Sequence, residues 1–168
     1  MNTPFKHLPV VYLHPGEVYF GDKPVVVSTV LGSCVSITVF SKKFNYGGIS
    51  HCMLPYCESK DDCKQCDDAY RYVYCTLDTM VQKFERMNLK RDELEIKAFG
   101  AADVLITKEE RLRSKTIGKQ NIRALENWMN KNKIKLTSYD VGGEKGRKLF
   151  FLPASGDVYI KKIVNEKD

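Results

Sequence analysis

Residues 27–40 read VSTVLGSCVSITVF, and this stretch carries the clearest structural pattern in the chain. Val35, Ile37 and Val39 alternate with polar residues, which indicates a β-strand with one buried face. Residues 47–54, GGISHCML, are expected to form its antiparallel neighbour. The first third of the chain is therefore predicted to be β structure, with Cys34 at the start of a hairpin.

Further strands and two helices are predicted on either side of this hairpin. Apolar residues recur at helical spacing in two stretches, which predicts two core-facing helices. The first contains Val73, Leu77, Met80, Val81, Phe84 and Met87, and the second contains Ile122, Leu125, Trp128 and Met129. Stretches rich in strand formers lie at 10–13, 18–21, 25–30, 94–99, 135–139, 148–152 and 158–164. The last three are expected to form a closing antiparallel meander.

Composition limits the class of protein. A chain of 168 residues that is 43% hydrophobic suits a single domain over residues 1–168 with a real core. No apolar run reaches the roughly 18 residues of a membrane span, so we expect a cytoplasmic chain with no membrane insertion. The net charge of +6 comes from 27 basic residues spread among 21 acidic ones. That spread argues against a nucleic-acid partner and suits an acidic protein partner.

The pairing of a cysteine with a histidine is the strongest chemical signal. If the two hairpin strands are joined by a four-residue loop at 41–44, Phe40 faces Asn45 and Cys34 lies directly opposite His51. The Cβ atoms of directly opposed residues are about 4.5–5.5 Å apart, which brings an imidazole within reach of a thiol. This geometry predicts that His51 activates Cys34 as a nucleophile.

The residues around Cys34 fit the same interpretation. Gly32 and Ser33 leave the backbone free to approach a substrate and to point N–H groups at an oxyanion. A free thiol has a pKa of about 8.5 and needs a nearby base at neutral pH, and His51 is the best-placed histidine. The alternative is that Cys34 is a small core residue and His51 a hydrogen-bonded polar one.

A set of motifs in a fixed order runs through nearly the whole chain. The set begins with VSTVLGSCVSITVF and with the histidine of GGISHCMLP, seventeen positions after the cysteine. It continues with PGE at 15–17, IKAFGAADVL at 96–105, IGKQN at 117–121 and DVGGEKGRKLFF at 140–151. This set resembles the CheD family of bacterial chemoreceptor glutamine deamidases. The resemblance implies an α+β fold, a three-layer α/β sandwich with largely antiparallel sheets and two main helices, whose Cys-His arrangement resembles that of the cytotoxic-necrotizing-factor toxins.

By this resemblance Cys34 is the nucleophile, His51 is the general base and a hydroxyl group is the third member. The family usually has threonine six positions before the cysteine, where this chain has Ser28, and Thr29 is the alternative. The implied reaction converts a receptor glutamine to glutamate through a thioester, with N–H groups near Ser33 stabilising the oxyanion. Methylesterase activity is a plausible second reaction. The resemblance implies no cofactor, and as partners a chemoreceptor cytoplasmic domain and a CheC-type phosphatase.

The other cysteines form a separate feature. Cys57, Cys63 and Cys66 lie in a polar segment at about 55–68, which is predicted to be an irregular surface loop not needed for the chemistry. Cys63 and Cys66 have the spacing of half a zinc site, but no second half is evident, so free thiols are preferred to a metal site. Cys75 is expected on the first helix.

Two other functions fit the cysteine-rich segment. The first is a non-catalytic interaction module in which a metal-stapled loop presents a basic surface to a chemotaxis partner. The second is a thiol-disulfide oxidoreductase built on Cys63 and Cys66, although the preceding loop does not supply the βαβ context that such a motif requires. Bound metal, together with full function after the removal of Cys34, would favour the module.

Overall fold

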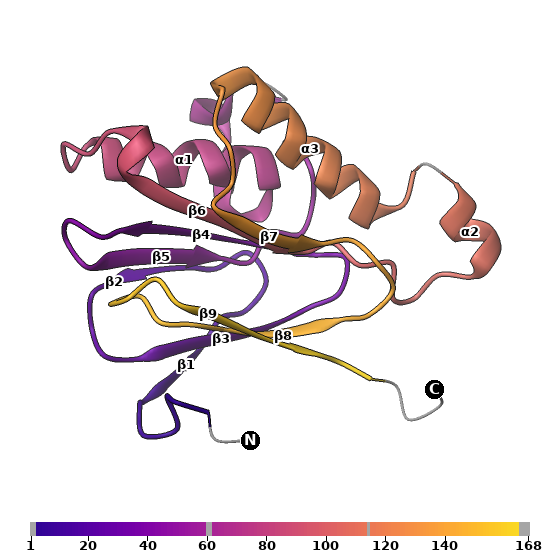
Figure 1. Cartoon of the computed structure of the whole chain (residues 1–168). Coiled ribbons are helices and arrows are strands. Elements are labelled where there is room, and N and C mark those ends of the chain that lie inside the picture. The colour runs from indigo at the N-terminus through magenta and orange to yellow at the C-terminus, as the bar shows by residue number, and fades with distance from the viewer. Residues whose placement is uncertain (1–2, 60–61, 114, 165–168) are drawn as a thin grey trace.

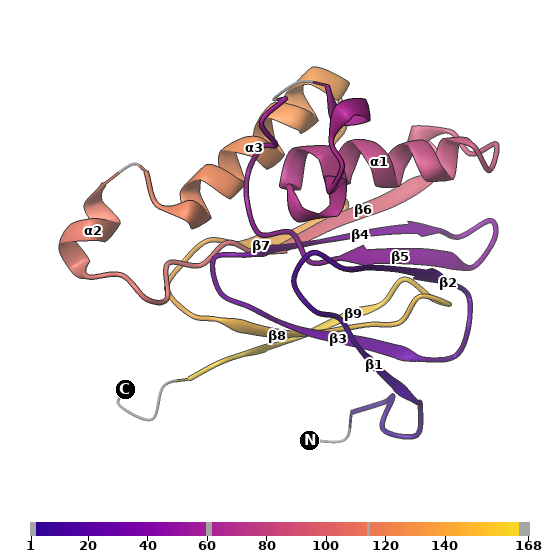
Figure 2. The same cartoon turned by 180° about the vertical axis from the view of Figure 1, so that it is seen from behind.

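The computed structural model describes residues 3–59, 62–113 and 115–164, which form three layers (Figures 1 and 2). A four-stranded sheet lies at the bottom of Figure 1 and a five-stranded sheet lies above it. Two long helices cover the outer face of the five-stranded sheet. This arrangement confirms the predicted α+β, three-layer fold with two main helices.

The two sheets are built from strands that are distant in sequence. The four-stranded sheet has the order β1 (Val10–Tyr12), β3 (Val26–Leu31), β8 (Arg147–Phe151) and β9 (Val158–Lys162). The five-stranded sheet has the order β2 (Val18–Gly21), β5 (Tyr46–Ser50), β4 (Val35–Ser41), β6 (Leu94–Gly100) and β7 (Ser138–Val141). The β1–β3 and β6–β7 pairs are parallel, and the other pairs are antiparallel. The sheets are therefore largely antiparallel, as predicted.

The helical layer consists of two long helices and several short ones. The long helices are α1 (Val73–Glu85) and α3 (Ile117–Asn132), and α2 (Lys108–Leu112) is a short helix that the sequence did not predict. The described residues also form the single-turn 3₁₀ helices η1 (Cys63–Gln65), η2 (Ala69–Arg71) and η3 (Arg91–Glu93). No helix in the described part of the chain is both long enough and apolar enough to cross a membrane.

Strand β4 lies at the centre of the molecule and is buried on both faces. Val35 and Ile37 pack against the helices, in the core cluster that contains Trp128. The opposite face, predicted to be exposed, is also buried because the four-stranded sheet covers it. Ser36 is accommodated there because its hydroxyl donates a hydrogen bond of 2.7 Å to the Ser50 carbonyl.

The predicted closing meander is wrong in one strand. β8 and β9 form an antiparallel hairpin, but β7 leaves them and pairs in parallel with β6 in the other sheet. Helix α3 connects β6 to β7, and a helical crossover of this kind is what joins parallel neighbours. Propensity identified the strand but could not assign it to a sheet.

Candidate active site

The hairpin register differs from the predicted one. Phe40 pairs with Gly47 instead of Asn45. Asn45 has a φ angle of 47°, in the left-handed region, so it belongs to the turn and not to the strand. Cys34 therefore does not lie directly opposite His51, and that part of the prediction is wrong.

Cys34 and His51 nevertheless lie on the same side of the sheet. The observed register differs from the predicted one by two residues, so each side chain stays on the predicted face of the sheet. The bridge between Val35 and Cys52 has the same register. His51 is then the diagonal neighbour of Cys34, a relation that places Cα atoms about 7–8 Å apart. Cys34 packs against the core between the sheets, whereas Cys52 packs on the helix side.

A hydroxyl group orients His51 and determines its tautomer. The Thr29 Oγ1 atom lies 2.7 Å from His51 Nδ1 and donates its proton to the Leu13 carbonyl at 2.8 Å. A hydroxyl has one proton to donate, so Nδ1 must carry a proton and donate it to Thr29. This tautomer leaves Nε2 unprotonated. Nε2 is buried and has no hydrogen-bond partner among the described residues, so it is free to accept a proton.

Ser28 does not take part in this arrangement, because successive strand residues point to opposite faces. Ser28 pairs with Phe150, whose ring contacts Phe5 of the N-terminal segment on the outer face of the four-stranded sheet. The Ser28 hydroxyl is buried there and has no partner among the described residues. The hydrogen bond to His51 therefore belongs to Thr29, the alternative, and not to Ser28, the first expectation.

Burial sets the protonation of the cysteine and the histidine. His51 is 3% exposed, and burial lowers its pKa to about 4, helped by the nearby His14 and opposed by a hydrogen bond to the Leu13 carbonyl. Burial also raises the pKa of the Cys34 thiol above its ordinary value. The resting pair is therefore a neutral thiol and a neutral imidazole, so Cys34 depends on a base to lose its proton during attack.

The buried imidazole has a consequence for stability. In the unfolded chain a histidine titrates near 6.5, whereas in the folded chain His51 has a pKa of about 4. Between these pH values the unfolded chain binds more protons than the folded chain. The contribution of the neutral His51 to the free energy of unfolding is therefore fully present above pH 6.5 and is lost as the pH falls toward 4. From pH 7 to pH 5 the expected loss is about 2 kcal/mol.

Urea unfolding at pH 7 and pH 5 measures this loss. From pH 7 to pH 5 the free energy of unfolding is expected to fall in both proteins. The fall should be about 2 kcal/mol smaller in the His51→Gln variant than in the unchanged chain. Carboxyl groups titrate in both proteins, so the comparison isolates the histidine. An identical pH dependence in the two proteins would contradict the buried neutral imidazole.

In the loop before β4 the carbonyl groups are all engaged, whereas the N–H groups have no partner among the described residues. The carbonyl oxygens of Gly32, Ser33 and Cys34 accept hydrogen bonds from the Ala102 N–H, the Asn121 side chain and the Ala101 N–H, respectively. The N–H groups of the same three residues donate to none of the described residues. Fixed N–H donors beside a nucleophile are the arrangement that stabilises an oxyanion.

Two residues that support this loop were not predicted as site residues. Gly100 has a φ angle of 108°, and a Cβ atom there would overlap the Cys34 carbonyl oxygen. Asn121, at the start of α3, is fully buried, and its amide joins the Ser33 carbonyl to that of Met53. Both lie within the motifs that carry the family resemblance, and that was the only signal for them in the sequence.

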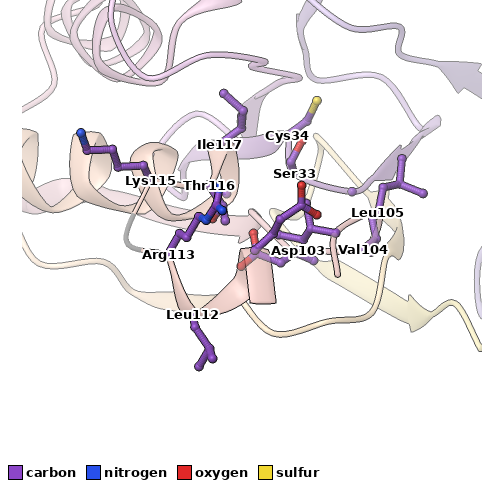
Figure 3. A pocket seen from close by; sticks show the side chains of 15 residues that line it. Ser33, Cys34, Asp103, Val104, Leu105, Leu112, Arg113, Lys115, Thr116 and Ile117 are labelled. Carbon is purple, nitrogen blue, oxygen red and sulfur yellow. The ribbon is translucent and has the colours of Figure 1, made fainter. Parts of the chain in front are cut away.

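A cavity of about 980 Å³ opens beside Cys34 (Figure 3). Figure 3 shows Ser33 and Cys34 at one end, Val104 and Leu105 on one side and Leu112 at the bottom. Leu105 is 95% exposed and Leu112 is 88% exposed. His51 is not among the lining residues, so the base lies outside this cavity, which Cys34 borders at one end.

The cysteines considered as metal ligands are less exposed than predicted. Cys57, predicted in a surface loop, is buried, and Cys63 and Cys66 are partly buried. Cys75 lies in the first turn of α1, as predicted, and is fully buried. The structure brings these four cysteines together.

Comparisons with known proteins agree on one family. A family model described as CheD chemotactic sensory transduction matches residues 53–162. A "Probable chemoreceptor glutamine deamidase CheD" of Maridesulfovibrio salexigens is 43% identical over 156 residues, which cover 91% of each chain. A "Probable chemoreceptor glutamine deamidase CheD 2" of Geobacter sulfurreducens is 36% identical and covers 97% of this chain and 96% of that one. An alignment of that extent spans Thr29, Cys34 and His51, which precede the match to the family model.

Two solved structures are distantly similar. The Bacillus licheniformis hypothetical protein YfiH has a TM-score of 0.36 and 11% identity, over 66% of this chain and 46% of that one. The Neisseria meningitidis protein NMB0706 has a TM-score of 0.39 and 12% identity, over 82% of this chain and 63% of that one. This chain therefore spans less than two thirds of either protein, and similarity at this level carries no functional information.

Proposed function

The chain belongs to the CheD family, and on that basis we propose that it deamidates glutamine side chains of chemoreceptors through a cysteine thioester. In this proposal Cys34 is the nucleophile, His51 is the general base and Thr29 is the residue that positions the base. The observation that supports it best is the buried, unprotonated and unpartnered Nε2 of His51, on the side of the sheet that Cys34 shares.

The first half of the reaction forms the thioester. Cys34 Sγ attacks the carboxamide carbon as its proton passes to His51 Nε2. The carbonyl oxygen becomes an oxyanion, and the free N–H groups of Gly32, Ser33 and Cys34 are the available donors. When the intermediate collapses, the C–N bond breaks, and His51 returns its proton to the leaving ammonia.

The second half hydrolyses the thioester. Neutral His51 accepts a proton from water, whose oxygen attacks the thioester carbon. The C–S bond then breaks, the Cys34 thiolate regains its proton from His51, and a glutamate side chain leaves. The Thr29 hydroxyl stabilises the charged imidazole in both halves because it accepts the Nδ1–H hydrogen bond.

The proposal extends to two further expectations. A methyl ester has the same carbonyl carbon and releases methanol in place of ammonia, so the same site can act as a receptor methylesterase. The binding of a CheC-type phosphatase stays a prediction from the family resemblance.

Mass spectrometry of a chemoreceptor cytoplasmic fragment tests the function. After incubation with this protein, each modified glutamine is expected to gain about 1 Da, because an amide nitrogen is replaced by oxygen. In water labelled with ¹⁸O the gain is expected to be about 3 Da, since that oxygen comes from the solvent. A fragment whose modified glutamines are replaced by glutamate is the control. Unchanged masses with the folded protein would refute the deamidase proposal.

We place the receptor helix in the cavity beside Cys34. Leu105 and Leu112 expose large apolar surfaces at the cavity, and exposed apolar groups around a cleft are typical of a docking surface. Arg113 and Lys115 line the same cavity together with Asp103 and Glu110, so its charged groups balance and the docking proposal rests on the apolar surfaces. A receptor helix in this position would present a glutamine side chain to the thiol.

Substitutions at the cavity rim are expected to weaken substrate binding without changing the chemistry. Leu105→Asp and Leu112→Asp should each raise KM by roughly 10-fold, since a buried leucine contributes about 1.5–3 kcal/mol. The kcat value should change little because neither side chain touches His51. Phe44→Asp, an exposed aromatic in the β4–β5 turn, is the matched control. A loss in kcat alone would argue against this docking surface.

A further inference from the structure

Four cysteine thiols outside the active site converge between the cysteine-rich loop and α1. The Sγ atoms of Cys57, Cys66 and Cys75 all lie within 4.8 Å of one another, and those of Cys57 and Cys75 are 3.5 Å apart. The Cys63 thiol interacts with that of Cys75, and also with Cys57 and Cys66. Three sulfur atoms, two from the loop and one from the helix, therefore share one small volume, and the Cys63 thiol lies next to them.

The separation of the Cys57 and Cys75 sulfur atoms matches a metal centre better than a disulfide. Zinc bound tetrahedrally by thiolates at about 2.3 Å keeps its sulfur atoms about 3.8 Å apart. A disulfide requires a separation of about 2.05 Å. The 3.5 Å between Cys57 and Cys75 lies close to the first value and far from the second.

The fold supplies the second half of a zinc site that the sequence lacks. Cys63 and Cys66 form a CxxC pair, and the loop begins and ends at the bridge between Leu54 and Tyr72. The Val73 N–H donates to the Leu54 carbonyl and the Tyr74 N–H to the Pro55 carbonyl. These bonds bring the two ends of the loop together, so Cys57 and Cys75 become the second pair.

The surroundings of the thiols favour a bound cation. Cys57 is 6% exposed and Cys75 is fully buried. A divalent cation stabilises thiolates that lie this close together and would otherwise repel one another.

We propose that Cys57, Cys63, Cys66 and Cys75 bind a structural zinc ion that fastens the cysteine-rich loop to the first turn of α1. Binding releases the four thiol protons and forms four Zn–S bonds. Four protein ligands leave no position for water or substrate, so the site is structural and not catalytic. Neither Cys34 nor His51 takes part, so this inference is independent of the deamidase proposal.

Metal analysis and spectroscopy test the site. Protein purified under reducing conditions without chelator is expected to contain about one zinc ion per chain, measured by inductively coupled plasma mass spectrometry. Replacement with Co²⁺ should give the absorption of a tetrahedral centre together with thiolate-to-cobalt charge-transfer bands. Removal of zinc with a chelator should lower Tm by roughly 5–15 °C, and added zinc should restore it.

Variants separate the zinc site from the active site. Cys57→Ser and Cys75→Ser are each expected to lose most of the zinc, while Cys52→Ser, a buried thiol outside the cluster, retains it. Cys66→Ser changes a partly exposed ligand, so it tests binding even if the buried variants fail to fold. Cys34→Ala should abolish deamidation and keep the zinc.

Three results would contradict the zinc site. One is a reduced, folded protein that contains no zinc and gives no charge-transfer bands with Co²⁺. Another is a peptide map of the freshly isolated protein in which Cys57 and Cys75 are joined by a disulfide, because that bond would consume two of the four ligands. Retention of zinc by Cys66→Ser and Cys75→Ser together would also contradict the assignment.

Discussion

Cys34→Ala and His51→Ala are each expected to slow deamidation by at least about 1,000-fold, and the double variant should be little slower than either. The reason is that the thiol is protonated at rest and depends on the imidazole to accept its proton. Removing either member therefore removes the same step. Initial rates of glutamate formation per folded molecule, measured by mass spectrometry, give the comparison.

Alkylation provides an independent measurement on the same pair. Iodoacetamide is expected to modify Cys34 more slowly in the His51→Ala variant than in the unchanged chain, because the variant lacks the base that removes the thiol proton. The alternative, a small core cysteine, predicts that Cys34→Ala costs about 1 kcal/mol of stability and leaves the rate per folded molecule unchanged. Deamidation by folded Cys34→Ala would refute the nucleophile assignment.

Thr29→Val should lower kcat by roughly 10- to 100-fold, whereas Ser28→Ala should change it less than about twofold. Valine has nearly the shape of threonine but cannot accept the Nδ1–H hydrogen bond, so His51 loses the partner that fixes its tautomer. Thr29→Ser keeps the hydroxyl and should recover most of the rate. Ser28 faces away from the histidine, so its removal leaves the pair intact.

The tautomer gives a measurement that a purely structural role would not change. Nitrogen NMR of His51 should show the Nδ1–H form in the unchanged chain and a mixture of tautomers in Thr29→Val. Unfolding measurements on the same variant correct for lost stability, because the Leu13 carbonyl also loses its donor. A larger effect of Ser28→Ala than of Thr29→Val would restore the original expectation for Ser28.

Most of the elements, and the side of the sheet on which Cys34 and His51 lie, follow from the sequence alone. Alternation around Val35 and helical spacing around Leu77 identify strands and helices, because both patterns are local consequences of backbone geometry. The odd separation of Cys34 and His51 across a hairpin put them on the same side of the sheet, and that relation survived the error in register because strand partners moved by two positions. The family resemblance added the three-layer fold.

The choice between the two neighbouring hydroxyls depends on contacts between the sheets. Ser28 and Thr29 belong to a strand of the other sheet, so which of them faces His51 depends on how the two sheets pack. The four thiols meet for a similar reason, because the bridge between Leu54 and Tyr72 closes the loop that carries three of them onto α1. Contacts between segments far apart in the chain leave no periodic pattern in the sequence, so local reasoning could name these residues but could not bring them together.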